Sequence, residues 1–183
     1  MEKLKRYERR FKESKSQIET PEFKKWFGRS KVKKSGKPLI VYHGTQEEYN
    51  FTKFKDVSFF TNKSSYADQY AGKDIRYYPN RENPDGTLGT QEIIFSKYGR
   101  ILPVYLKIQN PKYINKEDTK HNPKIEKEII IQAKKNKHDG LFILYDGTDR
   151  VDYVVFYPNQ IKSAIGNNGM FSSRSDNIYE RVN

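Results

Sequence analysis

The sequence contains no cysteine among its 183 residues, and only three histidines. The first absence excludes disulfide bonds, thiolate catalysis and cysteine-based zinc sites. Because no two histidines stand at a metal-ligand spacing, we also expect no metal ion. The chain lacks the GxxxxGK[ST] phosphate-binding loop and the Gly-x-Ser-x-Gly elbow of many serine hydrolases.

Apolar residues are scarce as well, at 34% of the chain, and no run of them approaches the roughly 18 residues that a membrane helix needs. The first 15 residues are charged throughout, which is unlike a secretory signal. We therefore expect a cytoplasmic protein with no membrane partner. Aromatic residues, at 14%, are too abundant for a disordered chain, and the length suits one domain with a buried core.

Positive charge is in excess, with a formal net charge of +12. Residues 1–37 carry 14 Lys and Arg against 5 Asp and Glu, a net +9, which leaves +3 for the remaining 146 residues. Such an arm is typical of proteins that bind nucleic acid or another polyanion. Its aromatic residues recur at helical spacing, however, which favours packing of this segment onto the body.

Apolar periodicity and turn residues predict an α+β protein whose strands form antiparallel pairs. Residues 72–100 match neither the helical nor the strand periodicity, so we expect a long loop or a hairpin there. We expect a basic helical arm over residues 1–20, a main domain over 21–172 and a polar tail over 173–183. The expected helices cover 1–17, 20–28, 64–71 and 122–138, and the expected strands cover 39–43, 57–61, 101–109, 141–145 and 151–157.

Two residues stand out as candidates for chemistry. His43 ends an apolar strand and precedes Gly44-Thr45, where side chains and bare backbone can both face a ligand. Asp152 shares a strand face with Val154 and Phe156. A carboxylate on an apolar face is costly to bury, so we expect it to be paired with a cation or to have a function. Each has a structural alternative, a capping hydrogen bond for His43 and an ion pair with Arg150 or a lysine for Asp152.

Short segments spread along the chain, taken in order, resemble one family. Three of them are similar to motifs of ADP-ribosyltransferases of the diphtheria-toxin and poly-ADP-ribose polymerase type: His43-Gly44-Thr45, Phe59–Tyr70 (FFTNKSSYADQY) and Asp152–Phe156 (DYVVF). A narrower resemblance, over residues 20–172, is to the ADP-ribosyltransferase domain of phage polyvalent proteins and mobile elements. It is carried by the segments 23–45, 59–71, 104–111 and 153–169.

The resemblance implies split antiparallel sheets with flanking helices and NAD⁺ as the substrate. His43, Phe59 and Asp152 would take the three catalytic positions. His43 and Thr45 would contact ribose, the backbone of Gly44 would hold the nicotinamide amide, and Phe59 and Tyr70 would stack on the nicotinamide ring. The same resemblance places Phe60 and Ala67 in the NAD⁺ site, with Ala67 where some members have serine.

Asp152 stands where the family has glutamate, and its side chain is one methylene shorter. A displacement of ~1 Å at a reacting centre can lower a rate ~10²-fold. Asp146 and Asp149, on the adjoining turn, are therefore reserve candidates for the carboxylate.

The function implied by the resemblance is transfer of ADP-ribose from NAD⁺ to a macromolecular acceptor, by a toxin or effector of a phage or mobile element. The acceptor, protein or nucleic acid, stays open, and a cognate antitoxin or immunity protein is an expected partner. The alternative is a basic module that binds nucleic acid or NAD⁺ through a degenerate, inactive site.

Overall fold

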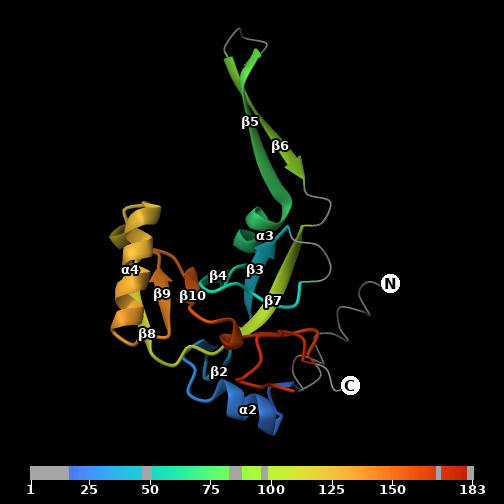
Figure 1. The fold of residues 1–183 in the computed structure, drawn as a ribbon, viewed down its shortest axis with the longest axis vertical. Coiled ribbons are helices and arrows are strands. Elements are labelled where there is room, and N and C mark those ends of the chain that lie inside the picture. Colours follow the sequence, from blue (N-terminus) through green and yellow to red (C-terminus); the bar gives the residue numbers. More distant parts are fainter. Residues whose placement is uncertain (1–16, 47–50, 83–87, 96–98, 168–169, 181–183) are drawn as a thin grey trace.

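The computed structural model describes residues 17–46, 51–82, 88–95, 99–167 and 170–180, with only the backbone given for 73–82 and 88–95. The helix predicted over residues 1–17 therefore lies, except for Gln17, outside the described residues. The described chain is α+β, as predicted, with helices packed on a mostly antiparallel sheet (Figure 1).

The main sheet has seven strands in the order β11-β7-β3-β4-β10-β9-β8. Every neighbouring pair is antiparallel except β8 and β9, which run parallel. The strands are β3 (Val41–Thr45), β4 (Ser58–Thr61), β7 (Arg100–Leu106), β8 (Pro111–Asn115), β9 (Gly140–Leu144), β10 (Val151–Val155) and β11 (Ile161–Ser163).

The sheet is nearly divided in two between β3 and β4. These strands share a single register pair, Tyr42 with Thr61, whereas β3 and β7 share five. Strands β11, β7 and β3 therefore form one half and β4, β10, β9 and β8 the other, which agrees with the split sheet that the resemblance implies.

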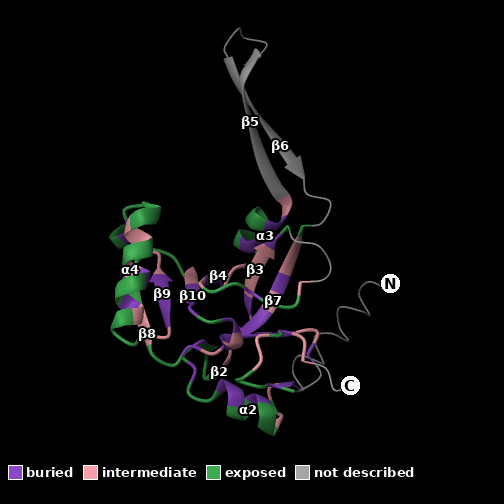
Figure 2. Ribbon diagram, in the orientation of Figure 1, coloured by how far each residue is buried: buried purple, intermediate pink, exposed green. Residues whose placement is uncertain are grey.

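Three α-helices are present in the described residues, and each begins where the sequence predicts. Helix α2 (Pro21–Phe27) has Thr20 as N-cap and proline in its first turn. Helix α3 (Ser64–Gly72) follows β4 directly and packs against β3. Helix α4 (Pro123–Lys135) has Asn122 as N-cap and covers the β8-β9-β10 half, with its outer face exposed (Figures 1 and 2).

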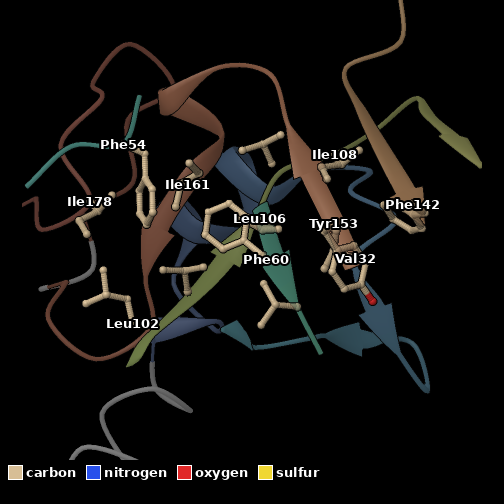
Figure 3. Close-up of a cluster of buried hydrophobic side chains, with 13 residues drawn as sticks. Val32, Phe54, Phe60, Leu102, Leu106, Ile108, Phe142, Tyr153, Ile161 and Ile178 are labelled. Atoms are coloured by element: carbon tan, nitrogen blue, oxygen red, sulfur yellow. The ribbon is translucent and has the colours of Figure 1, made fainter. Parts of the chain in front are cut away.

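The main core lies on the face of the sheet opposite α4. Figure 3 shows side chains from both halves of the sheet meeting there, among them Phe60 of β4, Leu106 of β7 and Tyr153 of β10. The alternate residues of β10 point the other way, so Val154 packs under α4 while Val155 packs into the main core. Both faces of β10 are thus buried, as its sequence predicts.

Strands β5 (Lys73–Glu82) and β6 (Leu88–Phe95) form a hairpin, one of the two alternatives predicted for residues 72–100. They pair only with each other, and the ribbon projects away from the body beyond α3 (Figure 1). A second, short hairpin joins β1 (Lys33–Lys34) to β2 (Lys37–Pro38) through the predicted turn at Ser35 and Gly36, which both have positive φ.

Two strands of the main sheet were not predicted from the sequence. Pro111 is the first residue of β8, although proline there was expected to stop a strand; β8 is at the edge of the sheet, where proline is tolerated. Strand β11 has three residues and follows a short 3₁₀ turn, Pro158–Gln160, so it is too brief for a periodic signal.

The C-terminal segment packs against the body in its described part. Ile178 is fully buried in the main core, and its backbone bonds both Thr52 and Ser163. The fully buried ammonium of Lys162 donates to the carbonyls of Ser175 and Asn177 and to the Glu180 carboxylate. The boundary drawn at residue 172 stays a prediction, but this segment is tied to the core.

Among the residues that the model describes, no helix has both the length and the apolar character to cross a membrane.

Candidate active site

A cavity of about 610 Å³ opens where the two halves of the sheet part. One row of paired residues crosses its floor, because Tyr42 pairs with Thr61, Thr61 with Asp152 and Asp152 with Ile143. The other lining residues come from β3, β4, α3, the 3₁₀ helix 116–119, α4 and the segments that connect this 3₁₀ helix to α4 and β9 to β10. They are His43, Gly44, Phe59, Phe60, Tyr66, Ala67, Tyr70, Lys116, His121, Glu126, Tyr145 and Arg150.

The His43 ring is held in a fixed orientation at one side of the cavity. Its Nδ1 lies 2.7 Å from the carbonyl oxygen of Phe59, and a carbonyl only accepts, so Nδ1 carries the hydrogen. The Phe54 ring meets the His43 ring edge-on, with 4.9 Å between the ring centroids, and the Phe60 ring packs against it with 5.4 Å between centroids. The predicted structural alternative for His43, a hydrogen bond to the backbone, is thus present in a residue that also faces the cavity.

Gly44 has a packing reason for lacking a side chain. A Cβ at this position would collide with the backbone carbonyl of Ala67, because α3 lies directly against β3. Ala67 is 2% exposed and its small side chain permits the same close approach. The backbone contact that the resemblance assigns to Gly44 stays a prediction.

Two aromatic rings stand at the mouth of the cavity. Phe59 is 40% exposed and Tyr70 is 67% exposed, although large aromatic side chains are usually buried. Phe60, the neighbour of Phe59, points the other way into the main core. The exposure of Phe59 and Tyr70 leaves their faces available to stack on a ligand.

Asp152 lies on the opposite side, with its side chain 16% exposed, and is held by two residues. Arg150 donates through Nε to Oδ1 at 3.0 Å and through Nη2 to Oδ2 at 2.6 Å, and the Tyr145 hydroxyl donates to Oδ2 at 2.6 Å. The predicted ion pair with Arg150 is therefore confirmed. It lies inside the cavity, so it does not exclude a chemical use of Asp152.

Burial raises the pKa of Tyr145 well above its usual value, and the hydrogen bond to Asp152 raises it further. Desolvation lowers the pKa of Arg150, but its bonds to Asp152 outweigh that effect and the net pKa is raised. Tyr145 and Arg150 thus remain a phenol and a cation over the whole physiological range.

The turn that carries Arg150 is anchored by Asn62 at the end of β4. Its side-chain amide donates to the Asp149 carbonyl at 2.7 Å and its oxygen accepts from the Val151 backbone at 3.0 Å. This bridge fixes the start of β10, and with it Asp152, relative to β4.

The remaining candidates lie away from the cavity. Thr45 is buried and is not among the described residues that line it. Asp146 and Asp149 are exposed on the turn, and Asp149 pairs with Lys63 at 2.5 Å, which lowers the pKa of Asp149. Of the three carboxylates considered, Asp152 alone lines the cavity. The described residues also contain no cluster of three His, Asp or Glu side chains suited to a metal ion.

A model of the family described as ADP-ribosyltransferase in polyvalent proteins matches residues 33–171. The chain belongs to this family. No curated protein and no solved structure matches the chain. The ADP-ribosyltransferase family uses NAD⁺ as its substrate, and polyvalent proteins are proteins of phages and mobile elements.

The matched region of this ADP-ribosyltransferase domain includes all the residues predicted for the site and several that sequence reasoning missed. Tyr66 lies within the recognised motif Phe59–Tyr70, but it was not among the four residues of that motif that were predicted for the site. Arg150 was considered only as an ion-pair partner. Lys116, His121 and Glu126 reach the cavity because α4 folds over this face of the sheet, and their polar segment carried no local signal.

Proposed function

We propose that this chain is an active ADP-ribosyltransferase and that NAD⁺ binds in the cavity at the split of the sheet. The observation that supports this most is the convergence of His43, Phe59, Tyr70 and Asp152 on one cavity of about 610 Å³. These residues come from three motifs spread over more than a hundred positions. The volume is within the usual range of roughly 300–1,000 Å³ for small-molecule sites.

The reaction breaks the bond between nicotinamide and C1 of the ribose. Nicotinamide leaves with the bonding electron pair, positive charge develops on the ribose, and an acceptor atom bonds to C1 while its proton passes to a base or to water. A carboxylate placed beside the ribose stabilises this charge, as in glycoside cleavage. In this proposal Asp152 has that role.

The other residues of the cavity would bind and orient the substrate. Phe59 and Tyr70 present exposed ring faces that can hold the flat nicotinamide ring. His43, with its ring plane fixed by the Phe59 carbonyl, would bond a ribose hydroxyl. Thr45 would act from its buried position by supporting β3.

The acceptor would be a macromolecule, protein or nucleic acid, and the chain would act as a toxin or effector of a phage or mobile element, held in check by a cognate antitoxin or immunity protein. The basic segment that opens the chain supports delivery to an acidic target. A degenerate module that only binds NAD⁺ is the competing outcome.

The test is release of nicotinamide from NAD⁺ by the purified full-length protein, followed by chromatography. We expect time-dependent release that His43→Ala abolishes. His138→Ala is the matched control, because His138 is a histidine outside the cavity that bonds only a backbone carbonyl among the described contacts. Binding of NAD⁺ without any nicotinamide release would favour the degenerate module.

The acceptor is tested with NAD⁺ labelled in the adenosine moiety and a bacterial lysate. Label that survives nuclease but not protease identifies a protein acceptor, and the reverse identifies nucleic acid. Growth arrest on expression of the wild type, relieved by His43→Ala, is the result expected of a toxin.

A further inference from the structure

The guanidinium of Arg150 is enclosed within the cavity in a way that an ordinary ion pair does not require. Its central carbon lies 3.8 Å from the centroid of the Tyr66 ring and 4.0 Å from that of Tyr145. Its edge meets both oxygens of Asp152. We call this arrangement, the rings of Tyr66 and Tyr145 with the Asp152 carboxylate, the guanidinium cage.

The cage joins separate parts of the fold. Tyr66 is on α3, Tyr145 directly follows β9, Arg150 directly precedes β10, and Asp152 is the second residue of β10. A guanidinium close to two aromatic rings gains cation–π energy from each of them, and the fork of the guanidinium matches a carboxylate edge. A lysine would provide the charge without this fit.

The same contacts restrict how Asp152 can meet a ligand. A carboxylate offers about four acceptor positions. Arg150 takes one on each oxygen and the Tyr145 hydroxyl takes a second on Oδ2. With the donors of the described residues in place, the open position is on Oδ1, and the plane of the carboxylate is set by two side chains.

We propose that Arg150 and Tyr145 are positioning residues for Asp152, and that the guanidinium cage is the device that aims this carboxylate. The inference rests on the proposed function, since it assigns Asp152 the stabilising role. It also explains how an aspartate can serve where the family has glutamate: a shorter side chain is useful if its position is fixed, because ~1 Å of misplacement can lower a rate ~10²-fold.

The first test is Arg150→Ala, measured as nicotinamide release over a range of NAD⁺ concentrations. We expect kcat to fall ~10²-fold with KM changed far less, because the carboxylate is released from its orientation while the stacking rings remain. Arg174→Ala, at an exposed arginine, is the matched control.

The second test is chemical rescue of Arg150→Ala by millimolar guanidinium chloride, far below denaturing concentrations. If the cage orients Asp152, guanidinium re-enters it and restores kcat several-fold, whereas the same concentration of sodium or tetramethylammonium chloride does not. Full activity of Arg150→Ala, or a loss that guanidinium leaves unchanged, would overturn the proposal.

Tyr145→Phe separates the hydroxyl from the ring. It keeps the cage wall but removes the bond to Oδ2, so we expect a fall in kcat of about 10-fold and no rescue by guanidinium. Tyr157→Phe, at a half-exposed tyrosine outside the cavity, is its control. Equal rates for Tyr145→Phe and wild type would contradict a positioning role for this hydroxyl.

A readout without turnover distinguishes this inference from the proposed function. In the wild type, the Nε–H of Arg150 should give a slowly exchanging NMR signal that Asp152→Asn and Tyr145→Phe each shift. If that signal is present but the wild type never releases nicotinamide, the proposed function fails and the cage stands. If Arg150 exchanges as fast as exposed arginines, the cage itself is wrong.

Discussion

Two shielded ion pairs serve different parts of the molecule. Lys162–Glu180 joins β11 to the C-terminal segment at 2.6 Å, with side chains 0% and 10% exposed. Arg150–Asp152 also spans 2.6 Å, but both its side chains are 16% exposed and line the cavity. Burial raises the cost of breaking the first pair, whereas the second pair remains in reach of a ligand. Similar chemistry thus ties the C-terminal segment to β11 in one place and, in our proposal, orients a catalytic carboxylate in the other.

The largest effect is expected from Lys162→Ala. Its ammonium also bonds two backbone carbonyls, so the change removes the cation beside the Glu180 carboxylate and the donor to both carbonyls. Breaking a buried pair from one side costs about 3–5 kcal/mol, which should appear as a lower free energy of unfolding in urea. Lys53→Ala is the matched control, since Lys53 pairs with Asp176 of the same segment at an exposed position, and should cost below about 1 kcal/mol. Equal losses of unfolding free energy in the two variants would contradict the expected difference between a buried and an exposed ion pair.

Asp152→Asn should do the reverse, with a large effect on catalysis and a small one on folding. We expect nicotinamide release to fall by roughly 10²–10³-fold, the usual size for removal of one group that stabilises the developing charge. Circular dichroism and the urea midpoint should stay near wild type, because both side chains of the pair can reach solvent through the cavity. Wild-type turnover by Asp152→Asn would show that another group stabilises the charge on the ribose.

Tyr153 is next to Asp152 in sequence, but its side chain lies on the core face of β10. The pH dependence of stability at this residue tests the contrast between groups buried in the core and groups that line the cavity. Burial, with a smaller contribution from Asp152, raises the pKa of Tyr153 to about 12. The stability that this tyrosine contributes is fully present below pH 10, where unfolded tyrosine titrates, and is lost as pH rises through 12. Tyr153→Phe should therefore reduce the alkaline loss of stability by on the order of 2 kcal/mol. Urea unfolding at pH 9 and pH 11.5 measures it, and identical pH dependence in the two proteins would contradict it.

Asp149→Ala should have the smallest effect. Asp149 pairs with Lys63 at the surface, and the contact that anchors the turn uses its backbone carbonyl, which the substitution keeps. We expect stability and nicotinamide release both within error of wild type. A strong loss of release would restore Asp149 as a candidate for the catalytic carboxylate.

Elements with a local signal were predictable from the sequence. Thr20-Pro21 and Asn122-Pro123 mark helix starts, and alternation in residues 151–157 reveals a strand buried on both faces. Strands β8 and β11 depend on neighbours distant in sequence. The residues from Pro111 and the short run after Pro158 therefore have no local pattern that predicts a strand. The hairpin of β5 and β6 was one of two alternatives, because the sequence of residues 72–100 is compatible with a loop and with a hairpin.

Most of the cavity-lining residues within recognised motifs were predicted from the sequence, Tyr66 being an exception, and those brought there by tertiary structure were not. His43, Tyr70 and Asp152 each belong to a motif with a defined order along the chain. Arg150 was predicted only as an ion-pair partner of Asp152, and Tyr145 reaches the same carboxylate because β9 pairs with β10. Gly44 was attributed to ligand contact, and its close approach to α3 became visible only in the fold.

The most direct measurement is a crystal structure of Asp152→Asn with NAD⁺, a variant expected to leave the substrate intact. The account predicts nicotinamide between the rings of Phe59 and Tyr70, a ribose hydroxyl on His43, and C1 of the nicotinamide ribose facing residue 152. NAD⁺ bound outside the cavity, or with its nicotinamide remote from residue 152, would contradict it.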